Sequence, residues 1–350
     1  MSGLLLVLLV SLIFVVLYQV SRSSELVASI QGEEEFDKKR NKMLGASMLL
    51  VWAALMIGFY ACHKYMMPLM GPEAASDHGK DYDFMFLVTL AVTGVVFLIT
   101  QFLLFWFAFK YQRDENRKAV FFSHSNKLEA IWTTVPALAM AVLVAIGLKS
   151  WFKMTGDAPK GAMQIEMVGK QFNWISRYPG ADGELGKRHF TKINDKDNLL
   201  GLDWEDKANM DDIIIPNGEI HLIKGKPVEL IIGSRDVIHD VGLTHFRLKV
   251  DAVPGITTRM WFTPTITTAE MKKKTGNENF VYEVSCDQMC GKGHYSMRAV
   301  IVVETQEEYN AWMAKQQSYY AQTHAVDSSA SPAVVGGTDS NKAITMNVKP

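Results

Sequence analysis

The stretch Cys286-Asp-Gln-Met-Cys290-Gly-Lys-Gly-His294-Tyr-Ser-Met297 brings two thiols, an imidazole and a thioether into one short segment. The chain has only three cysteines, and two of them stand four positions apart here. Thiolate, thioether and imidazole are the ligand types that suit copper. The two glycines after Cys290 indicate a loop that can fold tightly enough for the four side chains to converge. The stretch therefore predicts a metal-binding loop.

Three other interpretations of this loop compete with a dinuclear copper site. A disulfide between Cys286 and Cys290 requires an oxidising compartment and leaves His294 and Met297 without a role. Zinc accepts thiolates and imidazole, but methionine is a poor zinc ligand. A mononuclear blue-copper site uses one cysteine, two histidines and a weak methionine, whereas a second cysteine allows two metals bridged by both sulfurs. We favour copper over zinc, and zinc over a disulfide.

A copper site of this kind needs a second histidine, and residues 234–255 supply two candidates. His239 ends the run Asp-Val-Ile-His, and His245 follows six residues later. The next ten residues read Phe-Arg-Leu-Lys-Val-Asp-Ala-Val-Pro-Gly and end at Gly255. The residues alone leave the choice between the two histidines open.

Two motifs lie upstream of these histidines, and all four patterns together point to one family. The upstream motifs are Glu-Ala-Ile-Trp-Thr-Thr-Val-Pro, which ends at Pro136, and Gly-Lys-Gln-Phe-Asn-Trp, which ends at Trp174. Over about residues 84–310 the chain resembles subunit II of the haem–copper cytochrome c oxidases. The resemblance implies a dinuclear copper centre (CuA) in a cupredoxin domain. It also implies single-electron transfer from a c-type cytochrome to haem in subunit I, where oxygen reduction is coupled to proton translocation.

The resemblance also implies a set of metal ligands. These are two bridging thiolates, two terminal imidazoles, a weak thioether and one backbone carbonyl, from Cys286, Cys290, His239, His294, Met297 and Gln288. His245 is then a neighbouring loop residue. Glu129 matches a glutamate that the family uses at the mouth of a proton-uptake path. The alternative for Glu129 is a helix-start carboxylate that faces the N-terminal end of the helix dipole.

Several positions depart from the family pattern, and two of them bear on metal binding and electron entry. Gln288 stands where the family usually has glutamate, a change that leaves a backbone carbonyl in place. An amide oxygen is a weaker ligand for a hard cation, so the family's interfacial magnesium ion is not expected to be held in the usual way. Phe172 stands where the family has the tryptophan through which electrons enter. Either Trp174 or another surface aromatic then takes over, or the donor docks differently.

The first half of the chain contains long uncharged runs that predict about four membrane spans. A span needs about 20 apolar residues, and about 17 are tolerable. The runs are Leu4–Val20, Met43–Cys62, Phe84–Phe109 and Ala130–Ile146. The first run is short, but no basic segment precedes it and no small-residue cleavage site follows, so we interpret it as an anchor rather than a signal peptide.

Loop charges predict the orientation of these spans. The loop between the second and third runs has only Lys64 and Lys80, whereas the two flanking loops are strongly basic. Their basic residues are Arg22, Lys38, Lys39, Arg40, Lys42, Lys110, Arg113, Arg117, Lys118 and Lys127. Because basic loops stay in the cytoplasm, the metal loop is expected on the periplasmic side of a bacterial inner membrane. The near-zero net charge of −1 gives no indication of nucleic-acid binding.

After Trp151 the pattern changes to short runs rich in Val, Ile, Phe and Thr, which turn signals separate. Short runs of this kind, separated by turns, predict an all-β domain. We expect it to be a cupredoxin-like Greek-key barrel. The runs are Met163–Trp174, Glu219–Leu222, Val228–Ser234, His245–Val250, Arg259–Pro264, Phe280–Ser285 and Arg298–Glu304. A helix is expected over Gln306–Gln317, and the Ser-, Ala- and Gly-rich end is typical of a flexible tail.

These patterns predict four parts of the chain. Residues 1–83 hold additional N-terminal spans, 84–155 a transmembrane hairpin, 156–322 a periplasmic copper domain and 323–350 the tail. The additional spans are expected to contact an extra partner, within a larger respiratory assembly of oxidase subunits. The chain has no Cys-x-x-Cys-His motif for attached c-type haem, so its donor is a separate protein or neighbouring subunit.

Two other functions are compatible with a membrane-anchored copper domain. One is subunit II of a quinol oxidase, but that group generally lacks the copper ligands, which are all present here. The other is a membrane-anchored copper carrier or assembly protein, which would need neither the Glu129 motif nor the Gln171 motif. The electron-accepting subunit of a cytochrome c oxidase is therefore favoured.

Overall fold

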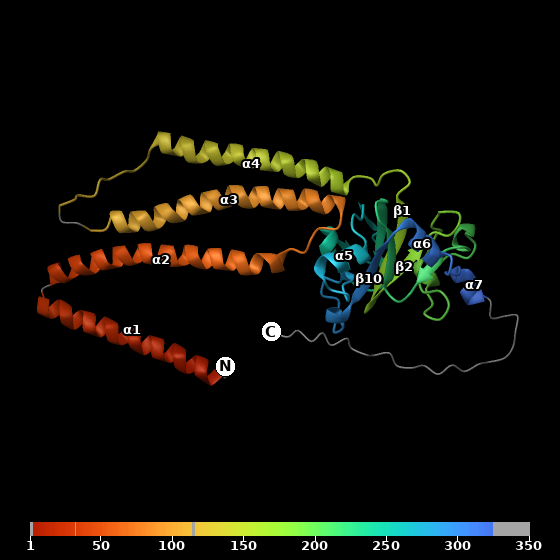
Figure 1. Ribbon diagram of the computed structural model, residues 1–350, viewed down its shortest axis with the longest axis horizontal. Coiled ribbons are helices and arrows are strands. Elements are labelled where there is room, and N and C mark those ends of the chain that lie inside the picture. Colours follow the sequence, from red (N-terminus) through yellow and green to blue (C-terminus); the bar gives the residue numbers. More distant parts are fainter. Residues whose placement is uncertain (1–2, 32, 114–115, 325–350) are drawn as a thin grey trace. The chain divides into compact units, whose positions relative to one another are not determined.

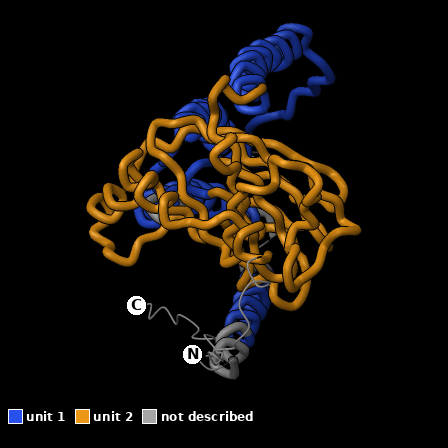
Figure 2. The backbone as a smooth tube through the Cα atoms, turned by 90° about the vertical axis from the view of Figure 1, so that its right-hand side faces the viewer, with its two compact units in different colours: residues 1–156, 244–247 blue, residues 157–243, 248–350 orange. Residues whose placement is uncertain are grey.

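The computed structural model describes residues 3–31, 33–113 and 116–324, which are drawn in colour in Figure 1. The chain divides into two compact units, residues 1–156 with 244–247 and residues 157–243 with 248–350 (Figure 2). From residue 325 onward, the predicted flexible tail lies outside the described residues.

The first unit is built from four long helices. They are α1 (Gly3–Gln31), α2 (Glu33–Met70), α3 (Asp77–Lys110) and α4 (Asn126–Thr155). Serine side chains cap two of the helix starts: Ser76 Oγ accepts a hydrogen bond from Gly79 N, and Ser125 Oγ accepts one from Leu128 N. Pro136 lies near the start of α4 and does not interrupt that helix.

Three of the four predicted spans are confirmed as candidates. Among the described residues, α2, α3 and α4 each contain a segment long and apolar enough to cross a membrane: Glu35–Met67, Asp77–Lys110 and Asn126–Thr155. The run Leu4–Val20 is helical within α1, but α1 is not among these three.

Aromatic contacts join α2 to α3. The ring of Trp52 lies 5.7 Å from that of Phe102, and the ring of Phe59 lies 6.0 Å from that of Phe97, measured between centroids. The second helix therefore packs directly on the third.

The second unit is an all-β domain of two five-stranded sheets, as predicted. One sheet has the order β3-β2-β1-β5-β8 and the other β4-β10-β9-β6-β7. The pairs β1–β5 and β4–β10 are parallel, whereas the other pairs are antiparallel. The strands are β1 (Met163–Lys170), β2 (Asn173–Tyr178), β3 (Ile213–Ile215), β4 (Glu219–Ile223), β5 (Val228–Ser234), β6 (His239–Leu243), β7 (Leu248–Ala252), β8 (Thr258–Phe262), β9 (Tyr282–Ser285) and β10 (Arg298–Glu304).

Buried residues of the strands form the core of this domain. Ile165 and Met167 of β1, Leu230 and Ile232 of β5 and Ile301 of β10 are all almost completely buried. Three helices complete the domain: α5 (Thr268–Thr275), α6 (Gln306–Met313) and α7 (Tyr319–His324). Short 3-10 turns lie at Phe190–Lys192, Lys207–Asn209, Thr244–Phe246 and His294–Ser296.

The strand predictions are correct in some places and wrong in others. The runs Val228–Ser234 and Arg298–Glu304 coincide with β5 and β10. The run Met163–Trp174 is wrong as a single strand, because the chain turns at Gln171 and Phe172 to form the β1–β2 hairpin. The predicted helix Gln306–Gln317 is confirmed as α6 but ends at Met313.

The run His245–Val250 is also wrong at its start. Thr244–Phe246 form a 3-10 turn, and Arg247 has a left-handed backbone with φ of 56°. The strand therefore begins only at Leu248. Sequence reasoning missed β6, whose residues His-Asp-Val-Gly-Leu include two poor strand formers, aspartate and glycine. Pairing along β7 makes this segment a strand in spite of that composition.

A buried ion network attaches the β1–β2 hairpin to the loop that follows it. Arg177 Nη1 lies 2.9 Å from Glu166 of β1, and Nε lies 2.9 Å from Asp212. The same guanidinium donates to Asn209 Oδ1 at 2.7 Å, and Arg188 pairs with Glu166. Burial raises the pKa of Asp212 to about 6, although Arg177 opposes that shift. The network therefore holds charges that would be costly to leave unpaired.

Candidate metal centre

The Cys286–Met297 loop connects two adjacent strands of one sheet. It leaves β9 at Ser285 and enters β10 at Arg298, and these two residues are cross-strand partners. The amide of Cys286 donates to the carbonyl of Met297 at 3.1 Å, which closes the loop at its base. Strand β6 pairs with β9 at Ser285 and begins at His239, so the sheet itself brings His239 to this loop.

The predicted ligand atoms form a connected set around the two thiols. Cys286 Sγ lies 3.8 Å from His239 Nδ1 and 3.8 Å from Cys290 Sγ. Cys290 Sγ in turn lies 3.7 Å from His294 Nδ1 and 3.8 Å from Met297 Sδ. Each thiol therefore has its own imidazole, and the two thiols face each other in the middle.

The backbone carbonyl of Gln288 completes the set. Its oxygen lies 3.2 Å from Cys286 Sγ, whereas Met297 Sδ contacts the other thiol, that of Cys290. His239, Cys286 and Cys290 are the one group of three or more His, Cys, Asp or Glu side chains with metal-binding proximity in the described part of the chain.

These separations fit ligands that share metal ions. Two ligand atoms bound tetrahedrally to one ion at about 2.0–2.3 Å lie roughly 3.3–3.8 Å apart. Cys286, Cys290, His239 and Met297 are all buried, and His294 is half-buried. Burial and the neighbouring Cys286 thiol raise the pKa of Cys290 to about 11, so a bound metal must displace its proton.

Two glycines allow the loop to lie under Phe172. Gly291 has φ of +135°, a conformation that favours glycine. A Cβ on Gly293 would lie 2.5 Å from Phe172 Cδ2, and one on Gly291 would lie 3.0 Å from Phe172 Cζ. The ring of Phe172 therefore packs directly on the ligand loop, and it is itself half-buried.

A shell of hydrogen bonds orients His239 and the loop. His239 Nε2 lies 2.8 Å from Asp236 Oδ1, so Nε2 carries the proton and Nδ1 is directed at Cys286. Asp236 Oδ2 also accepts from the amide of Gln171 at 2.7 Å. The Gln171 side chain donates to the carbonyl of Cys290 at 2.6 Å. The β1–β2 turn is thus connected to both sides of the site.

The imidazole of His239 is also enclosed by apolar and backbone atoms. Trp174 meets it edge-on, with ring centroids 5.9 Å apart, and is completely buried. A Cβ at Gly169 would lie 2.8 Å from His239 Cδ2, so only glycine leaves the ring enough space.

Replacing Asp236 with alanine is expected to weaken metal binding about 10- to 100-fold, the usual effect of losing a partner that orients a metal-binding histidine. A competition titration of the copper-loaded protein with a chelator measures this change. Asp195→Ala is the matched control, because this exposed carboxylate pairs with Arg235 and contacts no ligand. Equal affinities of the two variants would contradict the orienting role of Asp236.

The structure brings together the six predicted ligand groups and leaves the other predicted residues outside the cluster. His245 is half-buried in a 3-10 turn of the first unit. Glu129 is exposed in the first turn of α4. Sequence reasoning did not identify Asp236 or Gln171 as supporting residues, although both stand inside motifs that it quoted.

Comparisons with known proteins match both halves of the chain. Residues 64–152 match the family described as cytochrome c oxidase subunit II, transmembrane domain, and residues 163–305 match its periplasmic domain. The alternative cytochrome c oxidase subunit 2 of Bradyrhizobium diazoefficiens is 34% identical over 66% of this chain and 79% of its own length. Cytochrome c oxidase subunit 2 of Thermostichus vulcanus is 28% identical over 75% of this chain and 82% of its own.

Among solved structures, the periplasmic domain of subunit II of cytochrome oxidase from Bradyrhizobium japonicum is similar to this chain. It is 26% identical, with a TM-score of 0.30, over 45% of this chain and 94% of that one.

Proposed function

Because the chain belongs to the cytochrome c oxidase subunit II family, we propose that its β domain is cupredoxin-like and holds two copper ions at the Cys286–Met297 loop. As a member of that family, the chain is the electron-accepting subunit of a haem–copper oxidase. The observation that carries the copper proposal is the pair of thiols, 3.8 Å apart, with one imidazole beside each.

The proposed ligand set assigns a different task to each kind of side chain. The thiolates of Cys286 and Cys290 would be shared by the two ions, and the imidazoles of His239 and His294 would each hold one of them. Met297, which contacts Cys290, would be a weak ligand, and the Gln288 carbonyl, which contacts Cys286, would complete the set. When bound, the copper pair supplies a site for one electron, spread over both metals.

The protein's part in electron transfer is to keep this ligand cage fixed. Buried ligands, the Asp236 hydrogen bond to His239 and the loop closure at Cys286 all restrict rearrangement of the cage. A cage that changes little between oxidation states favours fast transfer.

The choice of electron donor tests the proposed function as an electron-accepting oxidase subunit. Oxidase purified with this subunit is expected to consume oxygen with a reduced c-type cytochrome as donor, and at background rate with a soluble quinol. Rapid oxidation of quinol with the cytochrome inactive would assign the complex to the quinol oxidases. A chain that releases its copper to a chelator and supports neither reaction would be a copper carrier.

Phe172 is the aromatic residue that we propose for electron input from the donor. Trp174 is completely buried, whereas Phe172 is partly exposed and packs on Gly291 and Gly293 of the ligand loop. A donor at the surface above the loop would therefore contact Phe172 and not Trp174.

Phe172→Leu is expected to slow reduction of the copper centre by cytochrome about tenfold, the effect of losing an interface aromatic that contributes about 1.4 kcal/mol. Stopped-flow absorbance measures this rate. Phe190→Leu is the control, since Phe190 is an exposed aromatic on another loop of the same domain. An unchanged rate for Phe172→Leu together with a slow Trp174→Leu variant would exclude this assignment.

The remaining proposals concern the surroundings of the domain. The copper domain, residues 156–322, lies on the periplasmic side of a bacterial inner membrane, after the transmembrane hairpin of residues 84–155. Residues 1–83 add spans that include the apolar run of α1, and these contact an additional partner. Subunit I accepts the electrons, and Glu129 stands at the mouth of its proton-uptake path. The last assignment rests on the match of the Glu129 motif to the family, and the Glu129 side chain is exposed.

A further inference from the structure

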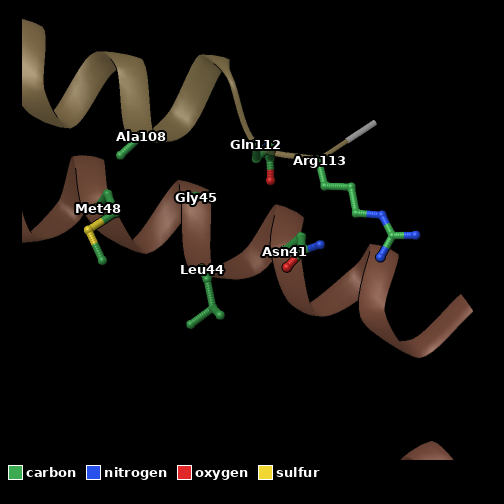
Figure 3. Close-up of a pocket in the computed structure, with 7 residues that line it drawn as sticks. All are labelled: Asn41, Leu44, Gly45, Met48, Ala108, Gln112 and Arg113. Atoms are coloured by element: carbon green, nitrogen blue, oxygen red, sulfur yellow. The ribbon is translucent and has the colours of Figure 1, made fainter. Parts of the chain in front are cut away.

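An open cleft with polar and apolar lining residues lies between α2 and the C-terminal end of α3 (Figure 3). It encloses about 230 Å³. Asn41, Gln112 and Arg113 supply its polar lining, and Leu44, Met48 and Ala108 supply its apolar lining. Because the candidate span of α3 ends at Lys110, the cleft lies at the level where lipid headgroups meet the helix ends.

Gly45 creates the space for this cleft. A Cβ at Gly45 would lie 3.0 Å from Gln112 Oε1, so the absence of a side chain lets the Gln112 amide lie against α2. The oxygen Oε1 is buried and has no hydrogen-bond partner among the described residues. Because this oxygen is buried, the Gln112 amide forms part of the wall of the cleft.

The charge around the cleft is positive on the α3 side. Residues 110–118 contain four basic and two acidic residues. On α2, the acidic residues Glu35 and Asp37 pair with Lys39 and Arg40 of the same helix, at 2.9 and 2.7 Å. The exposed residue Arg113 belongs to the lining of the cleft. Guanidinium groups bind phosphate through paired hydrogen bonds.

We propose that this cleft binds the headgroup of an anionic, hydroxyl-bearing phospholipid such as phosphatidylglycerol. Arg113 donates to the phosphate, and the side-chain amide of Asn41, which lines the cleft, donates to a glycerol hydroxyl of the headgroup. Leu44, Met48 and Ala108 contact the glycerol backbone and the start of the acyl chains. Basic sites between membrane helices commonly hold anionic lipids, and this one uses a face of α2, one of the additional N-terminal helices.

Native mass spectrometry of the detergent-purified complex tests the proposal. The complex is equilibrated with defined mixtures of phosphatidylglycerol and phosphatidylcholine, and retained lipid is counted at increasing collision energy. The wild type is expected to retain one phosphatidylglycerol per copy at this site, with at least tenfold preference over phosphatidylcholine. Arg113→Gln removes the phosphate contact, and Gly45→Leu fills the cleft without changing charge; both are expected to abolish the preference.

Lys127→Gln is the matched control, because Lys127 is an exposed basic residue in the first turn of α4 and does not line the cleft. It is expected to behave as the wild type. Loss of lipid from all three variants alike would overturn the proposal, as would equal retention of the two lipids by the wild type. Displacement of the bound lipid by free glycerol phosphate would also overturn it, because a soluble anion would then be the ligand. Cross-linking of the Met48→Cys variant to a neighbouring subunit would overturn it as well, because a protein would then fill the cleft.

Discussion

Cys290→Ser is expected to destroy the metal centre while leaving the domain folded. Cys290 Sγ contacts three of the other proposed ligands, Cys286, His294 and Met297, at 3.7–3.8 Å. A hydroxyl is a far poorer ligand for a soft metal than a thiolate. We therefore expect copper to fall from two to at most one per chain. Oxidase activity with cytochrome as donor should fall more than about 100-fold, beyond the range typical of supporting residues.

Elemental analysis and oxygen consumption measure the two effects, and Cys62→Ser provides the control. Cys62 is the third cysteine, exposed on α2 and outside the cluster. It should keep both copper ions and full activity. Retention of two coppers by Cys290→Ser would show that this thiol does not bridge them.

Arg177→Met is expected to give the largest loss of stability in the β domain. The guanidinium is 1% exposed and holds Glu166 and Asp212, both of which are also buried. Without it, the negative charges of these two buried carboxylates are no longer fully neutralised by a cation. Removing one partner of such a network costs about 3–5 kcal/mol of unfolding free energy. Chemical denaturation of the metal-free domain, followed by tryptophan fluorescence, measures the change.

Arg259→Met is the control for this prediction. Its guanidinium pairs with Glu229 at 3.1 Å but is mostly exposed, so its loss should cost about 0–1 kcal/mol. Arg177→Lys should also be strongly destabilising, since a single ammonium cannot contact both carboxylates and Asn209. A small effect of Arg177→Met would show that the carboxylates become neutral at little cost, in the direction of the raised pKa of Asp212.

The ligand loop could be predicted from the sequence because its chemistry is local. Cys286, Cys290, His294 and Met297 lie in one short segment, and their types alone indicate a copper site. His239 is different, because it lies far from this loop in the sequence and the sequence does not show that the two are close in space. The choice of His239 over His245 rests on the family resemblance, and the pairing of β6 with β9 places it beside the loop.

The parts that sequence reasoning missed depend on contacts between distant segments. Strand β6 has a composition typical of a turn and becomes a strand through its ladder with β7. Asp236 belongs to the Asp-Val-Ile-His motif and Gln171 to the Gly-Lys-Gln-Phe-Asn-Trp motif. Their hydrogen bonds to His239 and Cys290, however, require the β1–β2 turn to lie over the loop. The buried Arg177 network likewise joins residues whose charges suggest a solvated surface.

The most direct test of the copper centre is copper analysis combined with electron paramagnetic resonance of this chain, purified without its haem-bearing partner. Leaving out subunit I removes the other copper and haem signals of an oxidase. We predict two copper ions per chain and hyperfine structure in which the unpaired electron is shared by both nuclei. One copper per chain with hyperfine splitting from a single nucleus would contradict the dinuclear centre.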